Sequence, residues 1–151
     1  MSVPPPSLEF HNVLCAVDGS ADAALALAAA ILTVERTHAK LTLISVADDA
    51  SRRAGAVAFD PLLQQRIDES TQESLRVALA AVPDDIPITT LFRRGRPGQE
   101  IVAAAKEGEH DAVILGARGV GRVGALMGSV SQHVLHHSGT TVFVAHAPRD
   151  G

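Results

Sequence analysis

Glycines and arginines crowd the stretch between residues 116 and 129, where their chemistry suits the binding of a phosphate. Five glycines and two arginines lie between an apolar run typical of a strand and a run typical of a helix. Glycine lets a backbone amide approach an anion without a Cβ in the way, and the first amides of a helix are unpaired and partly positive. We therefore predict that the amides of Gly128, Ser129 and Val130 hold a phosphate. The alternative is a surface loop that only joins a strand to a helix.

Two widespread phosphate-binding motifs do not account for this stretch. Residues 119–124 fit the spacing G-x-G-x-x-G, but no helix is expected to start at Gly121. No second strand–helix–strand unit follows with an acidic residue for a ribose, so the dinucleotide-binding interpretation is weak. No Gly-Lys-Ser or Gly-Lys-Thr follows any of the glycines, which excludes a Walker A loop.

The elements that must position this stretch alternate between strands and helices. Because strands that alternate with helices form parallel sheets with right-handed crossovers, the pattern predicts a doubly wound α/β fold. Ligands of such folds bind beyond the carboxyl ends of the strands, so Asp18 and Gly116, which each follow a strand, are expected to meet in one crevice. The expected strands are 11–17, 40–46, 86–92, 111–115 and 141–145, and the expected helices are 21–37, 61–82, 97–107 and 129–137.

Two of the expected helices carry apolar residues at helical spacing, which predicts the face that each buries. On the helix at 21–37 this face consists of Leu25, Ala28, Ala29 and Leu32. On the helix at 61–82 it consists of Leu62, Leu63, Ile67, Leu75, Leu79 and Val82.

Two further groups of side chains have residue types that could bind ligands. Arg93, Arg94 and Arg96 follow an expected strand, and a solvated strand end is the favoured interpretation of this basic cluster. His133 and His137 share one face of the last helix and have the spacing of metal ligands. No acidic or cysteine partner stands near them in the sequence, so favourable placement of imidazoles in the last helical turn is the preferred interpretation.

Length and composition indicate one ordinary globular domain. The chain has 151 residues, of which 46% are hydrophobic and 20% charged. We expect a single domain over 10–147, a disordered proline-rich segment at 1–9 and a short tail at 148–151. The net charge of −4 and the lack of Trp and Tyr argue against nucleic-acid binding, which uses basic surfaces and stacking aromatic side chains.

The compartment can also be anticipated from the sequence. The longest apolar stretch, 23–34, is too short for a membrane span. The first ten residues contain three consecutive prolines and lack the basic and apolar regions of a signal peptide. The single cysteine, Cys15, fits a reducing environment. A cytoplasmic protein is therefore expected.

The glycine-rich stretch resembles the ATP-binding signature of the universal stress protein family, G-x2-G-x9-G-(S/T). The matching residues are Gly116-x-x-Gly119 and Gly128-Ser129-Val130-Ser131, with eight residues between the two parts. Further similar segments are 13–20, 43–46, 110–119 and 131–138, so the resemblance covers about 10–146. It implies an open, Rossmann-like sheet of the adenine nucleotide alpha hydrolase type, five parallel strands in the order 3-2-1-4-5, and a homodimer through the last strand, at about 141–146.

The resemblance also implies a site for ATP and Mg²⁺. Asp18 would hold the metal through the ATP phosphates or contact the ribose, and its alternative role is to cap the following helix. Backbone groups near Val17 and Val46 would surround the adenine, and two arginines would add positive charge. The expected ligand-binding residues are Ala16, Val17, Asp18, Val46, Leu115, Gly116, Arg118, Gly119, Arg122, Gly128, Ser129, Val130 and Ser131.

The implied function is that of a nucleotide-dependent stress sensor or regulator with an unidentified partner protein. The sequence offers no paired catalytic carboxylates, no supported Ser/His/Asp arrangement and no Cys/His pair with a third partner, so any ATPase activity is expected to be slow or absent. Two alternatives stay open. One is a dimeric interaction module that does not bind ATP, and the other is a binder of AMP or cyclic AMP in the same pocket.

Overall fold

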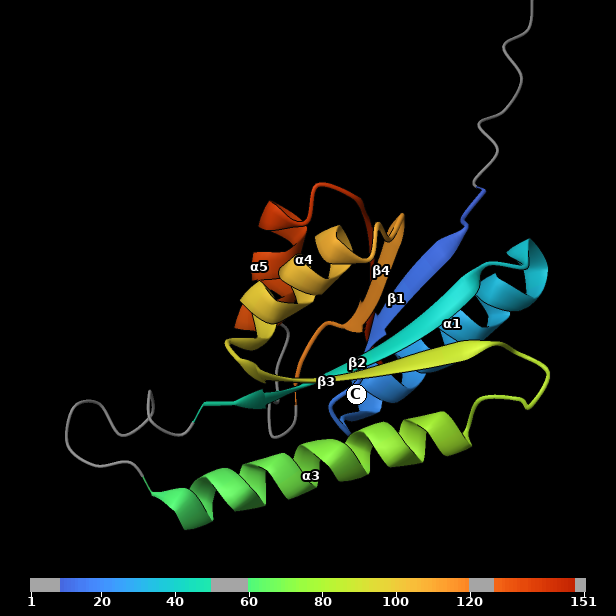
Figure 1. Ribbon diagram of the computed structural model, residues 1–151. Helices are drawn as coiled ribbons and strands as arrows, with labels where there is room; N and C mark the ends of the chain where they lie inside the picture. Colours follow the sequence, from blue (N-terminus) through green and yellow to red (C-terminus); the bar gives the residue numbers. More distant parts are fainter. Residues whose placement is uncertain (1–8, 50–59, 120–126, 149–151) are drawn as a thin grey trace, which may run out of the picture.

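The computed structural model describes residues 9–49, 60–119 and 127–148, which form an α/β fold around one parallel sheet (Figure 1). Five strands lie in the order β3-β2-β1-β4-β5, and every neighbouring pair is parallel. This confirms the expected fold class and strand order. The strands are β1 (Asn12–Ala16), β2 (Lys40–Asp48), β3 (Ile88–Gly95), β4 (Ala112–Gly116) and β5 (Thr141–Ala145).

Helices cover both faces of the sheet and divide the core into two clusters. Helices α1 (Ala21–Thr37) and α3 (Pro61–Ala80) pack on one face, where Val13 and Cys15 of β1 point. Helices α4 (Pro97–Glu107) and α5 (Ser129–His137) pack on the other face, with Leu14 of β1. The central strands are therefore buried on both sides, as parallel strands usually are. Burial raises the pKa of the Cys15 thiol to about 12, so this cysteine is a packing group.

Helix α1 buries a different face from the one that its leucines predict. Leu25 and Leu32 are 42% and 48% exposed, whereas Leu27 is 6% exposed and packs in the core beside α1's small alanines. Because α1 is rich in alanine all round, apolar spacing could not identify the buried side. Alanines at the sheet also allow the helix backbone to come close to the strands. The prediction of this face was therefore wrong.

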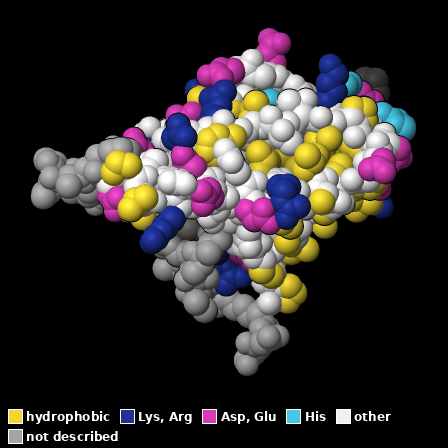
Figure 2. All heavy atoms as spheres, turned by 60° about the horizontal axis from the view of Figure 1, so that its bottom comes forward, with side chains coloured by type: hydrophobic (Ala, Val, Ile, Leu, Met, Phe, Trp, Pro, Cys, Tyr) yellow, Lys and Arg dark blue, Asp and Glu magenta, His cyan; other side chains and the backbone are white. Residues whose placement is uncertain are grey.

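The apolar face predicted for α3 was wrong as well in large part. Leu62, Leu63 and Leu79 are exposed, and Ala78 is the buried residue of this helix. Val82 is buried as predicted, but it lies beyond the helix end at Ala80. Hydrophobic side chains consequently reach the surface on the side of the molecule that carries α3 (Figure 2).

Strands β2 and β3 extend further than expected, because they pair with each other beyond their apolar residues. Asp48 lies opposite Gly95 at the end of this ladder. Arg93 and Arg94 therefore belong to β3, and both bind acidic side chains rather than water alone. Arg93 contacts Glu100 and Glu107, and Arg94 contacts Asp68. Arg94 and Arg96 are exposed, as a solvated strand end predicts, whereas the Arg93 side chain is 25% exposed and bound to α4.

None of the helices in the described ranges combines the length and the apolar character that crossing a membrane would require.

The orientation of α1 can be tested with two leucines that lie two residues apart. Truncating Leu27 to alanine removes a side chain from the core and should lower the free energy of unfolding by about 2–4 kcal/mol. Truncating Leu25 should cost less than about 1 kcal/mol, because its side chain is 42% exposed. Urea denaturation of Leu27→Ala and Leu25→Ala measures both. Equal losses, or a larger loss at Leu25, would contradict this orientation.

Candidate functional site

A cavity of about 340 Å³ opens at the carboxyl ends of β1, β2 and β4, between α3 and the first turns of α4 and α5. Its size is within the range of small-molecule sites. Eleven of the expected ligand-binding residues line it, namely Ala16, Val17, Asp18, Val46, Leu115, Gly116, Gly119, Gly128, Ser129, Val130 and Ser131. Arg118 does not line this cavity, and Arg122 lies outside the described residues. The sequence-distant segments after β1 and β4 thus meet in one crevice.

Asp18 stands at the turn between β1 and α1, with its carboxylate toward the glycines that follow β4. One oxygen accepts a hydrogen bond from the Ser20 backbone at 2.9 Å, which closes the turn around Gly19 at φ +83°. The other, Oδ2, is 3.3 Å from where a Cβ on Gly119 would lie. The cap of α1 is Ser20, whose hydroxyl accepts from Ala23 N at 3.1 Å. The alternative role of Asp18 as helix cap was therefore wrong, and its carboxylate belongs to the cavity.

Gly116 is needed because the chain passes directly over the start of α1. A Cβ at this position would lie 2.8 Å from the backbone nitrogen of Ala23, a separation that real side chains do not tolerate. The next residue, Ala117, then supplies a carbonyl that accepts from Gly128 N at 2.7 Å and from the Ser131 hydroxyl at 2.9 Å. These bonds fix the start of α5 against the end of β4.

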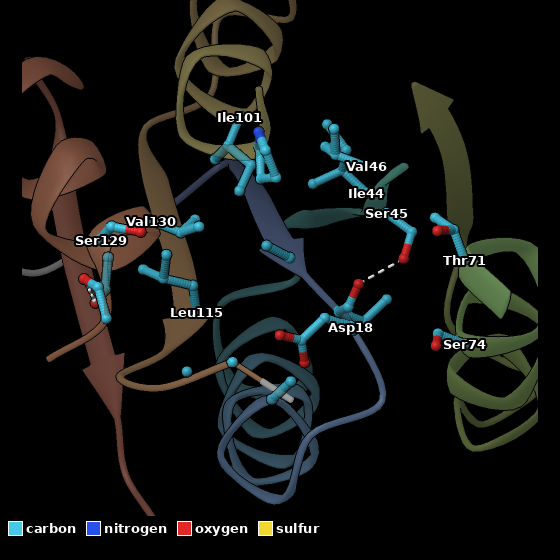
Figure 3. A pocket seen from close by; sticks show the side chains of 18 of the residues that line it. Asp18, Ile44, Ser45, Val46, Thr71, Ser74, Ile101, Leu115, Ser129 and Val130 are labelled. Atoms are coloured by element: carbon cyan, nitrogen blue, oxygen red, sulfur yellow. Dashed lines mark hydrogen bonds between the residues drawn. The ribbon is translucent and has the colours of Figure 1, made fainter. Parts of the chain in front are cut away.

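The start of α5 therefore offers fewer free groups than the sequence suggested. The amide of Gly128 is bound to Ala117 O, and the Ser131 side chain is buried and bound to the same carbonyl. Gly128 is also the N-cap residue and has no side chain with which to cap the helix. Because the first amides of a helix have no partner within it, Ser129 and Val130 become the groups best placed to hold an anion. Both line the cavity (Figure 3).

Arg118 binds Asp22 of α1 instead of facing the cavity. Its Nε lies 2.9 Å and its backbone nitrogen 3.1 Å from Asp22 Oδ2. Its Nη2 lies 3.1 Å from Oδ1, which also accepts from Ala147 N at 2.8 Å. The Asp22 side chain is only 4% exposed. The hydrogen bonds from Arg118 hold the pKa of Asp22 below its usual value, although burial alone would raise it.

The remaining walls of the cavity were missed by sequence reasoning. Ile44 and Ile101 join the expected Val46, Leu115 and Val130 in an apolar wall. Opposite Asp18, α3 contributes hydroxyl groups from Ser70, Thr71 and Ser74. The apolar residues of this helix alone predict a different buried face. Polar residues at positions i, i+1 and i+4 were the available signal.

The described residues contain no group of three or more His, Cys, Asp or Glu side chains placed to hold a metal ion. The rings of His133 and His137 stack with their centres 4.2 Å apart. Neighbouring His137 and His136 reinforce the effect of burial in lowering the pKa of His133. These histidines pack against one another in the last turns of α5.

Comparison with known proteins identifies relatives over nearly the whole chain. Residues 9–146 match the sequence profile of the Universal stress protein family. A curated universal stress protein of Thermus aquaticus is 31% identical over 128 residues, which span 83% of this chain and 91% of that protein.

Solved structures share the fold at lower sequence identity. A universal stress protein of Lactobacillus plantarum has a TM-score of 0.71 and 24% identity, covering 92% of this chain and 99% of its own. A universal stress protein in complex with cAMP has a TM-score of 0.60 and 23% identity, with coverage of 91% and 98%. An Archaeoglobus fulgidus universal stress protein in complex with dAMP has a TM-score of 0.60 and 16% identity, with coverage of 91% and 99%.

The buried pair of Asp22 and Arg118 predicts a specific dependence of stability on pH. Since the folded-state pKa of Asp22 is lowered, the ionised carboxylate stabilises the fold above its unfolded pKa of about 3.9. This contribution is lost as the pH falls through the folded pKa. At pH 7, Asp22→Asn should lower the free energy of unfolding by about 1.5–3 kcal/mol, and this deficit should shrink at acidic pH.

A matched control is Asp68→Asn, because Asp68 pairs with Arg94, whose side chain is 61% exposed. That change should cost less than about 1 kcal/mol at pH 7. Urea denaturation at pH 7 and in the most acidic buffer that keeps the protein folded measures both variants. If Asp22→Asn lowered the free energy of unfolding equally at both pH values, the ionised Asp22 carboxylate would not be the source of the stabilisation.

Proposed function

Because the chain belongs to the universal stress protein family, we propose that it binds ATP with Mg²⁺ and acts as a nucleotide-dependent stress sensor or regulator. The observation that carries this proposal is the convergence of two features on one cavity. The first turn of α5 and the Asp18 carboxylate both line it, although they are far apart in the chain. Helix-start amides suit phosphate oxygens, and a carboxylate suits a ribose or a phosphate-bound cation.

The proposed nucleotide lies along the cavity from α5 toward α3. Its β- and γ-phosphates are held by the amides of Ser129 and Val130, and its ribose lies near Asp18 and the backbone of Gly116 and Gly119. The adenine lies at the Val46 end of the apolar wall, away from Val130. This order follows from the covalent order of the nucleotide once its phosphates are placed at the helix start.

Mg²⁺ would enter this site together with the nucleotide. Magnesium is usually held by one or two carboxylates, substrate phosphates and water rather than by a cage of protein ligands. Asp18 is exposed and is the one ionisable side chain among the described residues that line the cavity. A single carboxylate is enough for a metal ion that arrives bound to phosphates, because the phosphates and water supply its other ligands. Without the nucleotide, Asp18 alone would not form a metal site.

The same set of cavity-lining residues favours a regulator over a catalyst. General acid–base or nucleophilic chemistry requires at least two cooperating groups near the reacting atoms. Asp18 has no ionisable neighbour among the described lining residues. ATP hydrolysis is therefore proposed to be slow or absent, and the bound nucleotide acts through the conformation that it stabilises.

We also propose that the protein works in the cytoplasm as a homodimer joined through residues 141–146, with a regulatory protein as its target. Strand β5 lies at one end of the sheet and pairs with β4 on its inner side. The Phe143 side chain on this strand is 39% exposed. An edge strand of this kind is a ready site for pairing with another chain.

The second candidate ligand is an adenosine monophosphate, either AMP or cyclic AMP. Two of the similar structures are described as complexes with cAMP and dAMP. The adenine and ribose contacts proposed here do not depend on the outer phosphates. A third candidate, a dimeric interaction module that takes no nucleotide, is the outcome if every ligand fails to bind.

The phosphate position can be tested by changing the charge at the start of α5. A Cβ on Gly128 would lie 3.4 Å from Ala117 O, which is an ordinary contact, so the folded chain accepts a Cβ here. Gly128→Glu should weaken ATP binding by about tenfold or more, because its carboxylate would oppose the phosphates. Gly128→Ala is the matched control and should change the Kd by less than about threefold.

Isothermal titration of wild-type protein and both variants with ATP, AMP and cyclic AMP, with and without Mg²⁺, measures these effects. The proposal predicts binding of ATP that Mg²⁺ strengthens and that Gly128→Glu impairs. Tight binding of the monophosphates with no gain for ATP would favour the second candidate. Heat from ATP that is unaffected by Gly128→Glu would place the phosphates elsewhere.

A further inference from the structure

Hydroxyl groups of α3 form one side of the cavity, and the ATP contacts proposed above give them no role. Ser70, Thr71 and Ser74 line the cavity from this helix. The side chains of Thr71 and Ser74 lie on the side of α3 that faces Asp18 and Val46 (Figure 3). Their position opposite the start of α5 makes them the far end of the proposed site.

The hydrogens of these hydroxyl groups are already used within α3. Thr71 Oγ1 donates to the carbonyl oxygen of Ile67 at 2.7 Å, and Ser74 Oγ donates to that of Ser70 at 3.1 Å. A hydroxyl has one hydrogen and two lone pairs, and threonine and serine often donate to the carbonyl one turn earlier in a helix. Both side chains therefore present acceptor lone pairs to the cavity.

Strand β2 also places a hydroxyl group at this end of the cavity, and its hydrogen is likewise bound to the backbone. Ser45 is buried, and its hydroxyl donates to the carbonyl oxygen of Val17 at 2.5 Å (Figure 3). Like the Thr71 hydroxyl, it donates its hydrogen to a backbone carbonyl. The hydroxyl groups on both sides of this end thus accept hydrogen bonds, which favours a ligand group that donates them.

The position of Thr71 matches the base rather than the sugar of the proposed nucleotide. Ser74 lies beside the turn that carries Asp18, since a Cβ on Gly19 would be 3.0 Å from Ser74 Oγ. Ser74 therefore accompanies the ribose position. Thr71 lies one turn earlier in α3, across from Ser45 and Val46, where the base is proposed to lie.

We propose that Thr71 determines base specificity by accepting a hydrogen bond from the exocyclic amine of adenine. Purines that carry a carbonyl at this position would place an acceptor against the Thr71 lone pairs and be rejected. This inference rests on the proposed nucleotide function and goes beyond it, because it assigns the choice of base to a side chain of α3. Adenine nucleotides are thereby selected over hypoxanthine and guanine nucleotides.

The test compares ATP with ITP, whose hypoxanthine has a carbonyl in place of the amine. Wild-type protein should bind ATP at least about tenfold more tightly than ITP. Thr71→Val keeps the shape and branching of the side chain and should weaken ATP binding about three- to tenfold, with ITP binding unchanged or improved. Thr71→Ser retains the acceptor and should restore the preference for ATP.

Thr33 on α1 provides a matched control. Its hydroxyl donates to the carbonyl of Ala29 at 2.8 Å, the same bond that Thr71 makes with Ile67, and it lies outside the set of residues that line the cavity. Thr33→Val should leave the ATP-to-ITP ratio unchanged. Titration with 2′-deoxy-ATP distinguishes a contact with the base from a contact with the ribose, because this ligand lacks one ribose hydroxyl and keeps the amine of adenine.

The outcomes separate this inference from the proposed function. ATP binding with an unchanged ATP-to-ITP ratio in Thr71→Val would overturn the inference and leave the nucleotide function standing. A Thr71→Val effect on the ratio of ATP to 2′-deoxy-ATP, without one on ATP to ITP, would assign Thr71 to the ribose and also overturn it. Absence of ATP binding by the wild-type protein would remove the proposed function, and the inference with it.

Discussion

The carboxylate of Asp22 joins three segments of the chain beneath the cavity. It is buried at the start of α1, where it binds the backbone and guanidinium of Arg118 and the backbone amide of Ala147. These contacts connect α1 to the segments that follow β4 and β5. Breaking a buried pair leaves an uncompensated charge, so the positions of all three segments depend on this one group.

This anchor determines how the cavity can attract an anion. With Arg118 bound to Asp22, the same segment directs the Ala117 carbonyl to the amide of Gly128 and so fixes the beginning of α5. In the proposed complex, the partial charge of the helix-start amides at Ser129 and Val130 therefore attracts the phosphates. The backbone amide of Ala147, which follows the edge strand β5, binds the same carboxylate, so this anchor also connects α1 to the end of that strand.

The sequence predicted the order of the elements and most residues that line the cavity, because polar and glycine positions at strand ends must lie at one edge of a parallel sheet. It could not predict the partner of Arg118, since Asp22 is far away in the chain. The buried face of α1 could not be predicted either, because alanines occur on all sides of that helix. The place of the α3 hydroxyl groups was not predicted, because the apolar spacing of that helix indicates a different buried face.

The most direct test of the central claim is an NMR titration that follows the backbone amides at the start of α5. ATP and adenosine are added in turn to ¹⁵N-labelled protein in the presence of Mg²⁺. The account predicts that the amide signals of Ser129 and Val130 shift with ATP and stay nearly in place with adenosine, whereas signals around Val46 shift with both. If ATP binds and the signals of Ser129 and Val130 do not move, the phosphates lie elsewhere and the account is contradicted.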